Sequence, residues 1–248
     1  MLRPVTPTAG VVLAPNPGPM TLDGTNTWVL REASSESCVV VDPGPLMQAH
    51  LDEVAACGPV DVVLLTHGHP DHSEGARRFA ELTGAPVRAL DRAHRLGDEG
   101  LGEGDVVAAA GIELRVLATP GHSSDSLSFV LDDAVLTGDT VLGRGTTVVA
   151  HPDGVLGEYL ESLSRLQELG DLTVLPGHGP ELPSAGTAAQ QYLAHREQRL
   201  EQVRAALAAG ASTPQQVVEI VYADVDRGLW PAATLSVRAQ LAYLQGER

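Results

Sequence analysis

The 248-residue sequence contains no lysine, so all 16 of its basic residues are arginines. They are outnumbered by 32 acidic residues, which gives a formal net charge of −16. Residues 1–183 hold the whole excess, with 10 arginines and 26 acids, because residues 184–248 carry 6 of each. A surface that binds nucleic acid is normally basic. We therefore exclude a general nucleic-acid surface and expect any RNA contact to be local, close to the candidate metal site described below.

Cysteines and long apolar runs are also scarce. Only Cys38 and Cys57 occur, which are too few for a disulfide framework, and we expect both to be reduced thiols. The longest apolar runs fall far short of the roughly 18 residues that a membrane-spanning helix requires. No segment after Met1 has the pattern of a signal peptide. We expect a cytoplasmic protein that does not enter a membrane.

Apolar strand patterns alternate with helical patterns over the first three quarters of the chain. Strands are predicted at 11–14, 26–31, 38–42, 60–65, 87–90, 112–118, 127–131, 134–137 and 172–175. Helices are predicted at 46–56 and 156–169, with another that begins at a capping Ser73 and ends before Gly84. This alternation indicates an α/β domain over residues 1–183.

From about residue 184 only helical patterns occur. They cover 188–207, a helix that starts with Thr213 as N-cap and Pro214 in the first turn, and 229–244. We predict a small helical domain over residues 184–248.

The stretch Thr66 to His72, T-H-G-H-P-D-H, follows the predicted strand 60–65 directly. Three further strands run into a turn of small residues and then a His or Asp, in T-P-G-H, T-G-D-T and P-G-H-G, which place His122, Asp139 and His178. Loops that meet at one edge of a sheet would explain this repetition. Five histidines interleaved with two aspartates favour a metal site, whereas a lone histidine is more often a surface or capping residue.

The spacing suggests how two ions are shared. His67 and His69 can bind one ion, Asp71 and His72 can face a second, His122 and His178 can complete the two sets, and Asp139 can bridge them. This all-nitrogen and oxygen set suits Zn²⁺ and would also accept Fe or Mn. The four other histidines are separate: His50, His94 and His195 are expected to be solvent-facing or packing residues, and His151 follows a loop that borders the site.

The motifs T-H-G-H-P-D-H, T-P-G-H, T-G-D-T and P-G-H-G-P resemble those of the metallo-β-lactamase superfamily. Three further stretches, N-P-G-P-M-T-L-D-G-T-N-T-W-V-L, G-R-G-T-T-V and H-R-E-Q-R, resemble its β-lactamase-like protein 2 branch. The resemblance implies an αββα sandwich with two metals at one edge. In it the first metal is held by His67, His69 and His122, the second by Asp71, His72 and His178, and Asp139 bridges them.

The same resemblance extends to one further site residue and to the C-terminal part. It implies that Asp42, in V-V-V-D-P-G, orients metal ligands from a second layer, although an ordinary turn carboxylate is equally consistent with the sequence. The branch has a winged-helix module at its C-terminus. Because this chain stops soon after its third predicted helix, we expect a truncated, helical version of that module.

The expected chemistry is hydrolysis. Two divalent ions that share a water supply a bridging hydroxide as nucleophile without a Ser or Cys. Asp71 and Asp139 are the candidate catalytic carboxylates, since Asp71 can also help to move a proton. The loops that border the substrate are expected to carry Asn26, Arg144, Thr146 and Thr147, although a solvated loop arginine is the simpler interpretation of Arg144.

Three functions fit this pattern. The first is hydrolysis of a small ester, thioester or lactone. The second, implied by the resemblance to the β-lactamase-like protein 2 branch, is cleavage of single-stranded RNA by an endoribonuclease. The third is a metal-bound binding protein without catalysis, which the open coordination position of such a site argues against.

Overall fold

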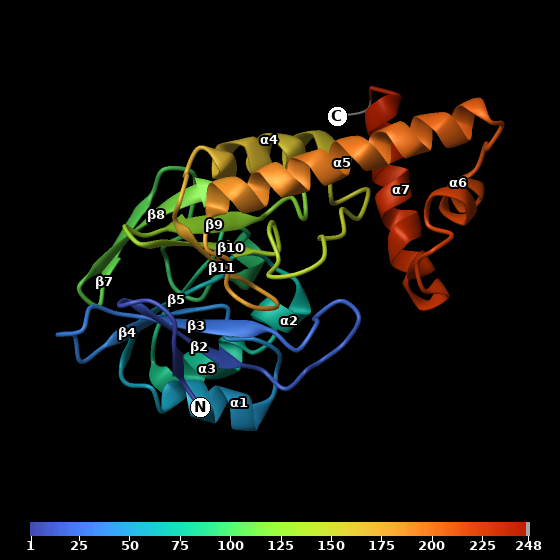
Figure 1. Ribbon diagram of the computed structural model, residues 1–248. Coiled ribbons are helices and arrows are strands. Elements are labelled where there is room, and N and C mark those ends of the chain that lie inside the picture. Colours follow the sequence, from blue (N-terminus) through green and yellow to red (C-terminus); the bar gives the residue numbers. More distant parts are fainter. Residues whose placement is uncertain (247–248) are drawn as a thin grey trace.

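Two β-sheets pack face to face between two layers of helices in the computed structural model, which describes residues 1–246 (Figure 1). The first sheet has the order β1 (Arg3–Pro4), β2 (Ala9–Leu13), β3 (Asn26–Leu30), β4 (Cys38–Val41), β5 (Val60–Leu64), β6 (Val87–Arg88). The second has the order β11 (Thr173–Pro176), β10 (Ala134–Gly138), β9 (Leu127–Val130), β8 (Ile112–Ala118), β7 (Val106–Ala109). β4, β5 and β6 are parallel, as are β10 and β11, and the other pairs are antiparallel.

The alternation of side chains along the strands builds two apolar layers at once. Val39 and Val41 of β4 point between the sheets, where they join a cluster that includes Phe129. Cys38 and Val40 point the other way, toward the cluster that includes residues of α1 (Gln48–Ala55) and α3 (Ala76–Thr83). Both faces of β4 are therefore buried, which explains its continuous apolar sequence.

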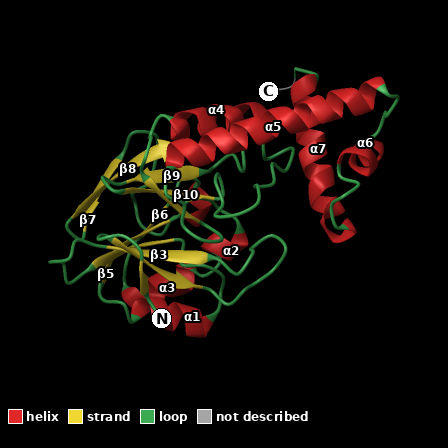
Figure 2. Ribbon diagram, in the orientation of Figure 1, coloured by secondary structure: helices red, strands yellow, loops and turns green. Residues whose placement is uncertain are grey.

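The outer face of the second sheet is covered by α4 (Leu156–Gln167) and by the first half of α5 (Ala185–Ala208). The second half of α5 extends past the sheet and packs through Val203 and Ala206 against α6 (Pro214–Val221) and α7 (Trp230–Leu244). Within residues 184–246 the structure contains only helices, including the short 3₁₀ helix η2 (Arg227–Leu229) (Figure 2). None of the helices in residues 1–246 is long and apolar enough to cross a membrane.

The predicted αββα sandwich with a helical C-terminal part is confirmed. Thr213 caps α6 as predicted, in a reciprocal pair with Gln216. The prediction for Ser73 is wrong: this residue ends the short helix α2 (Pro70–Ser73), its hydroxyl donates to the carbonyls of Gly68 and His69, and α3 begins later. α5 begins at Ala185, but its first half packs on the second sheet and its second half packs on α6 and α7. It therefore belongs to both parts, and the predicted domain boundary at residues 183 and 184 stays a prediction.

Candidate metal centre

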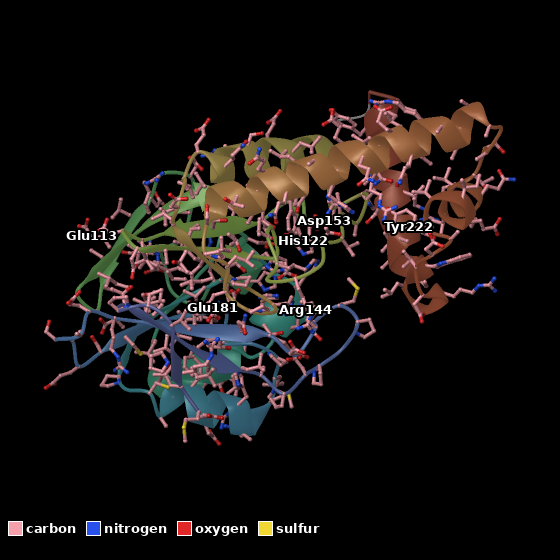
Figure 3. The ribbon with its side chains drawn as sticks, in the orientation of Figure 1. Glu113, His122, Arg144, Asp153, Glu181 and Tyr222 are labelled. Carbon is pink, nitrogen blue, oxygen red and sulfur yellow. The ribbon has the colours of Figure 1, made fainter. Side chains whose placement is uncertain are left out.

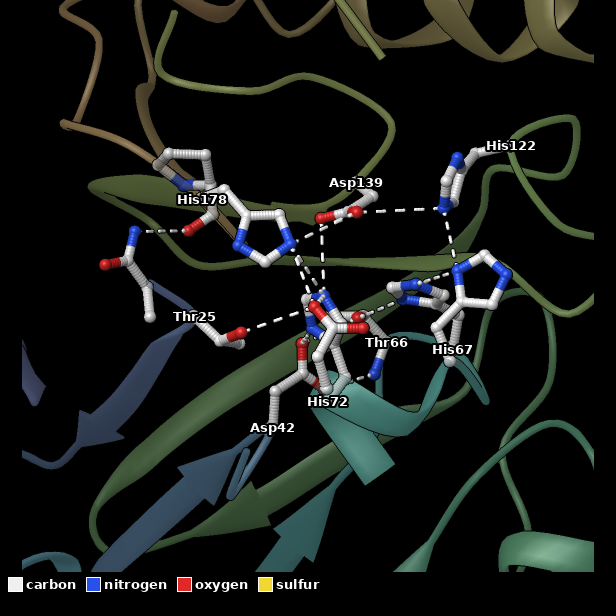
Figure 4. Close-up of polar contacts among 12 residues, drawn as sticks. Thr25, Asp42, Thr66, His67, His72, His122, Asp139 and His178 are labelled. Carbon is white, nitrogen blue, oxygen red and sulfur yellow. Dashed lines mark hydrogen bonds and ion pairs between the residues drawn. The ribbon is translucent and has the colours of Figure 1, made fainter. Parts of the chain in front are cut away.

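Side chains from four strand ends and one short helix meet at one edge of the sandwich (Figure 4). His67 follows β5, His122 follows β8, Asp139 follows β10 directly, and His178 follows β11. Pro70 starts α2 immediately after His69, because its fixed φ and missing N–H suit the first helical position. The first turn of that helix then carries Asp71 and His72.

The structure brings all seven predicted ligand side chains together, six of them in two sets of three. In the first, His69 Nδ1 lies 2.9 Å from His67 Nε2 and 3.0 Å from His122 Nε2. In the second, Asp71 Oδ2 lies 3.1 Å from His178 Nε2 and 3.3 Å from His72 Nε2. The two groupings are those that the family resemblance implies, whereas the binding of ions by them stays a prediction.

Asp139 lies between the two sets. Its Oδ1 atom is 3.4 Å from His72 Nε2, and its Oδ2 atom is 3.4 Å from His178 Nε2 and 3.7 Å from His122 Nε2. Oδ1 is buried and has no hydrogen-bond partner among residues 1–246. A buried carboxylate oxygen without a donor fits a cation, since it otherwise bears the full cost of lost hydration.

Four of the five histidines are anchored through the ring nitrogen that points away from the centre. The contacts are His67 Nδ1 to Thr66 Oγ1 at 3.0 Å, His72 Nδ1 to Asp42 Oδ2 at 2.8 Å, His122 Nδ1 to the Val148 carbonyl at 2.8 Å, and His178 Nδ1 to the Gly24 carbonyl at 3.0 Å. A ring anchored in this way directs the lone pair of its other nitrogen inward, as metal-binding histidines do. The donor set therefore fits divalent ions.

Asp42 is one of these anchors and is itself held from two sides. Its Oδ1 accepts the backbone N–H of Thr66 at 2.8 Å, and its Oδ2 accepts the Thr66 hydroxyl at 2.7 Å. The residue is buried and its φ of 52° is left-handed, a strained conformation for a residue other than glycine. The structure thus places Asp42 against His72, and its role in orienting a ligand stays a prediction.

The glycines that precede Asp139 and His178 are explained by close approach. A Cβ atom on Gly177 would lie 2.5 Å from Asp139 Oδ1 and 2.7 Å from His72 Cε1. A Cβ atom on Gly138, where φ is +49°, would lie 2.6 Å from Thr66 Oγ1. Only glycine lets the turns approach the centre this closely.

Burial and neighbouring charges set the protonation of the metal-free centre. Burial and the proximity of His72 hold the pKa of His67 well below its usual range, so this imidazole is neutral. Burial opposes ionisation of Asp139, but His72 and His178 outweigh it and hold the pKa of Asp139 well below normal. Burial lowers the pKa of His178, but hydrogen bonds with Asp139 and Asp71 outweigh it and raise this pKa to about 9. A metal ion bound here would compete with this proton for the His178 imidazole.

A cavity of about 320 Å³ opens beside His122 and Asp139 and reaches the C-terminal helices. Among the predicted substrate contacts, Arg144, Thr146 and Thr147 line it. Asn26 lies elsewhere: its amide donates to the carbonyls of Pro176 and Gly179 at 2.9 and 2.8 Å and so ties β3 to the turn that carries His178. Contact of any of the four with substrate stays a prediction.

Sequence reasoning missed the residues that α5 and the segment after α6 contribute to this cavity, namely His195, Arg196, Arg199 and Tyr222. The sequence predicts a solvent-facing or packing role for His195, and the structure places it half-buried on the cavity wall. The stretch H-R-E-Q-R carried the signal, because positions 195, 196 and 199 share one helix face. His50 is a buried packing residue, as expected.

Two family models match the chain. The metallo-beta-lactamase superfamily model matches residues 20–178, and the beta-lactamase associated winged helix domain model matches residues 213–248. The first match contains all seven residues of the candidate centre.

Curated proteins and solved structures resemble the chain over most of its length. An atrochrysone carboxyl ACP thioesterase of Aspergillus fumigatus is 34% identical over 85% of this chain and 72% of its own. A beta-lactamase-like protein 2 homolog of Drosophila melanogaster is 30% identical over 95% of this chain and 87% of its own. The crystal structure of a metallo-beta-lactamase family protein from Thermus thermophilus superposes with a TM-score of 0.81 at 25% identity, covering 98% of this chain and 94% of that one.

Proposed function

Because this chain belongs to the metallo-beta-lactamase superfamily, whose members are hydrolases, we propose that it is a two-zinc hydrolase of a small thioester, ester or lactone. The observation that carries the proposal is the pair of His and Asp sets joined at Asp139, next to a cavity of about 320 Å³. Support for a thioester comes from the relative of Aspergillus fumigatus that is named as a thioesterase.

The fold and its His and Asp clusters imply a metal cofactor. In the proposal His67, His69 and His122 would hold one zinc and Asp71, His72 and His178 would hold the other, with Asp139 shared by the two sets. With divalent ions bound, the site would supply hydroxide as nucleophile from a metal-bound water and a Lewis acid that polarises the substrate carbonyl. Iron or manganese would also suit these nitrogen and oxygen donors.

The chain itself positions the substrate and moves the proton. Asp71 is the more exposed of the two carboxylates, with 26% of its side chain accessible against 10% for Asp139. It is therefore the more accessible of the two to solvent, and the Thr25 hydroxyl donates to it at 3.3 Å. We assign to Asp71 the transfer of a proton toward the leaving group. Leu142, Val225 and Ala233 make part of the cavity wall apolar, and apolar surroundings weaken the screening of nearby charges.

Metal content and turnover test this proposal together. Metal per chain is measured by mass spectrometry for the wild type, Asp139→Ala and the surface control Asp224→Asn. Each protein is then given thioesters, esters, lactones and a labelled single-stranded RNA. The expected result is two zinc ions per wild-type chain and acyl turnover that falls at least about 100-fold in Asp139→Ala, the size of effect seen when a main electrostatic group of an active site is removed.

The other outcomes choose between the remaining hypotheses. Cleavage of the RNA alone, lost in Asp139→Ala, would replace the acyl substrate with the endoribonuclease function. Fewer than one tightly bound ion, or equal activity of Asp139→Ala, would overturn the metal-dependent mechanism and favour a binding protein.

A further inference from the structure

The cavity beside the metal centre is lined by more basic than acidic side chains. Asp139 is the one acidic residue among those that line it within residues 1–246, whereas three arginines do so: Arg144, Arg196 and Arg199. This local excess of positive charge contrasts with the formal net charge of −16 of the whole chain. It points to a ligand that carries negative charge.

Two of the three arginines lack an acidic partner. Arg144 forms an ion pair with Asp23, so its charge is already balanced. Arg196 and Arg199 lie three residues apart on one face of α5, and within residues 1–246 neither forms an ion pair with a carboxylate. Their charge is free to act on whatever enters the cavity.

The surroundings of these two side chains fix them in place. Arg196 is only 3% exposed, its Nη2 donates to the Thr147 carbonyl at 2.6 Å, and its buried Nε has no hydrogen-bond partner among residues 1–246. Arg199 is half-buried, its Nη1 donates to the Val221 carbonyl at 3.0 Å, and its guanidinium lies 4.7 Å from the centre of the Tyr222 ring. A buried guanidinium without a counter-charge is costly, and a carboxylate or phosphate pairs with it through two parallel hydrogen bonds.

Arg199 lies apart from the metal centre along α5. The Tyr192 hydroxyl, near the start of the helix, accepts the backbone N–H of Leu142 at 3.0 Å, three residues after Asp139. Arg199 is seven residues further along, which is about 10 Å of helix. Val225 and Leu229 line the cavity at the C-terminal helices, and in Figure 3 Tyr222 lies on those helices, away from His122 and Arg144.

We propose that Arg199, supported by the charge of Arg196 and the ring of Tyr222, forms an anion subsite that selects substrates with a phosphate or carboxylate separated by an apolar stretch from the bond to be cleaved. The identity of that bond rests on the proposed function. The subsite rests on the cavity and its charges alone.

Binding measurements test the subsite without requiring turnover. The probes are hydrolysis-resistant thioethers that share one alkyl chain in place of the acyl chain. They are a coenzyme A thioether, an N-acetylcysteamine thioether with a terminal carboxylate on the chain, and an uncharged N-acetylcysteamine thioether. Affinities of the metal-loaded wild type, Arg199→Gln, Arg199→Lys and the control Arg204→Gln are measured by calorimetry. Arg204 lies on the same helix but is paired with Glu201.

We expect the wild type to bind at least one anionic probe about 10-fold or more tighter than the uncharged probe, as expected for a charge-assisted contact. Arg199→Gln should remove most of this preference, Arg199→Lys should restore part of it, and Arg204→Gln should keep it. Preference for the coenzyme A probe identifies a phosphate, and preference for the terminal carboxylate identifies an acyl-chain anion. Equal binding of all probes by the wild type, or an unchanged preference in Arg199→Gln, overturns the proposal.

Turnover of the matching thioesters separates the two proposals. If the anionic preference is present in binding but no thioester is cleaved, the proposed thioester function fails while the subsite stands. If the thioesters are cleaved and anionic and uncharged forms have the same KM, the function stands and the subsite fails.

Discussion

The Nδ1 atom of His72 lies 2.8 Å from the Oδ2 atom of Asp42, and both side chains are almost fully buried, at 0% and 2% exposure. The carboxylate also accepts two hydrogen bonds from Thr66, which directly precedes His67. One buried carboxylate thus contacts both Thr66, in the loop between β5 and α2, and His72, within α2. We therefore predict that Asp42, directly after β4, orients the metal centre.

Asp42→Ala should weaken metal binding by about 10- to 100-fold, the usual effect of removing a group that orients a ligand. The reason is that His72 loses its acceptor and its ring becomes free to rotate. Asp42→Asn should give a smaller loss, because the amide oxygen can still accept from His72. The measurement is competition with a chelator of known affinity.

Asp224 provides the control for this series, since it is exposed on the C-terminal helical part. Asp224→Asn should keep the wild-type affinity. If Asp42→Ala also bound metal as tightly as the wild type while remaining folded, Asp42 would be an ordinary turn carboxylate.

Gly177→Ala should disturb the centre by crowding. The added Cβ atom would lie 2.5 Å from Asp139 Oδ1, so the carboxylate must move away from its position between the two sets. We expect a stability loss of about 1–3 kcal/mol, typical of overpacking, together with weaker metal binding. Gly102→Ala is the matched control, because its nearest atom would lie 3.7 Å away, in ordinary contact. Metal affinity and urea unfolding of both variants decide the matter; equal values would contradict the steric explanation.

The sequence shows which side chains gather at the centre because their signal is local, whereas metal binding by them stays a prediction. His67, His122 and His178 each follow an apolar strand and a tight turn, so the motif itself fixes where each side chain goes. The strand predicted at 112–118 has the bounds of β8, because its apolar run ends at a Thr-Pro-Gly turn. β1 was missed because it has two residues and owes its conformation to pairing with β2.

The cavity could not be predicted in the same way. Arg196 and Arg199 belong to a helix whose sequence shows no apolar stripe that would reveal its orientation, since one half packs on the sandwich and the other on α6 and α7. Which face of α5 looks toward the metal centre is decided by tertiary packing. Contacts between segments far apart in sequence, such as that of Arg196 with Thr147, leave no local pattern.

His50 should make stability depend on pH. The Thr27 hydroxyl donates to the Asp42 carbonyl at 2.7 Å, so the His50 Nε2 at 2.9 Å must donate to Thr27, and the buried Nδ1 has no partner among residues 1–246. Burial lowers the pKa of His50, so the unfolded chain takes up a proton more readily than the folded one. The contribution of His50 is therefore complete above its unfolded pKa of about 6.5 and is lost as the pH falls below it.

His50→Gln isolates this contribution, because glutamine keeps a donor for Thr27 and does not titrate. We expect the free energy of unfolding of the wild type to fall more steeply between pH 7 and pH 5 than that of the variant, with both at the same metal content. Urea unfolding at several pH values measures the two slopes. Parallel slopes would show that His50 is not a source of the pH dependence.

Arg196→Met should loosen the metal centre from a distance. The Arg196 guanidinium donates to the Thr147 carbonyl, and the next carbonyl, of Val148, is the anchor of His122 Nδ1 at 2.8 Å. Removing the donor leaves a buried carbonyl without a partner, which costs about 1–3 kcal/mol. It also frees the segment that holds His122, so both stability and metal affinity should fall.

Arg199→Met separates the effect of losing the hydrogen bond from Arg196 to the Thr147 carbonyl, here called the clamp, from the effect of losing a positive charge. It removes one positive charge from the same face of α5. Arg199 donates to Gln202 and to the Val221 carbonyl and lies over the Tyr222 ring, and within residues 1–246 it makes no hydrogen bond to the segment that anchors His122. If the clamp holds His122, metal affinity falls in Arg196→Met and stays near the wild-type value in Arg199→Met. Removing a nearby cation alone would strengthen the binding of a divalent ion in both variants. The two explanations therefore predict opposite signs for Arg196→Met, and chelator competition distinguishes them in one experiment.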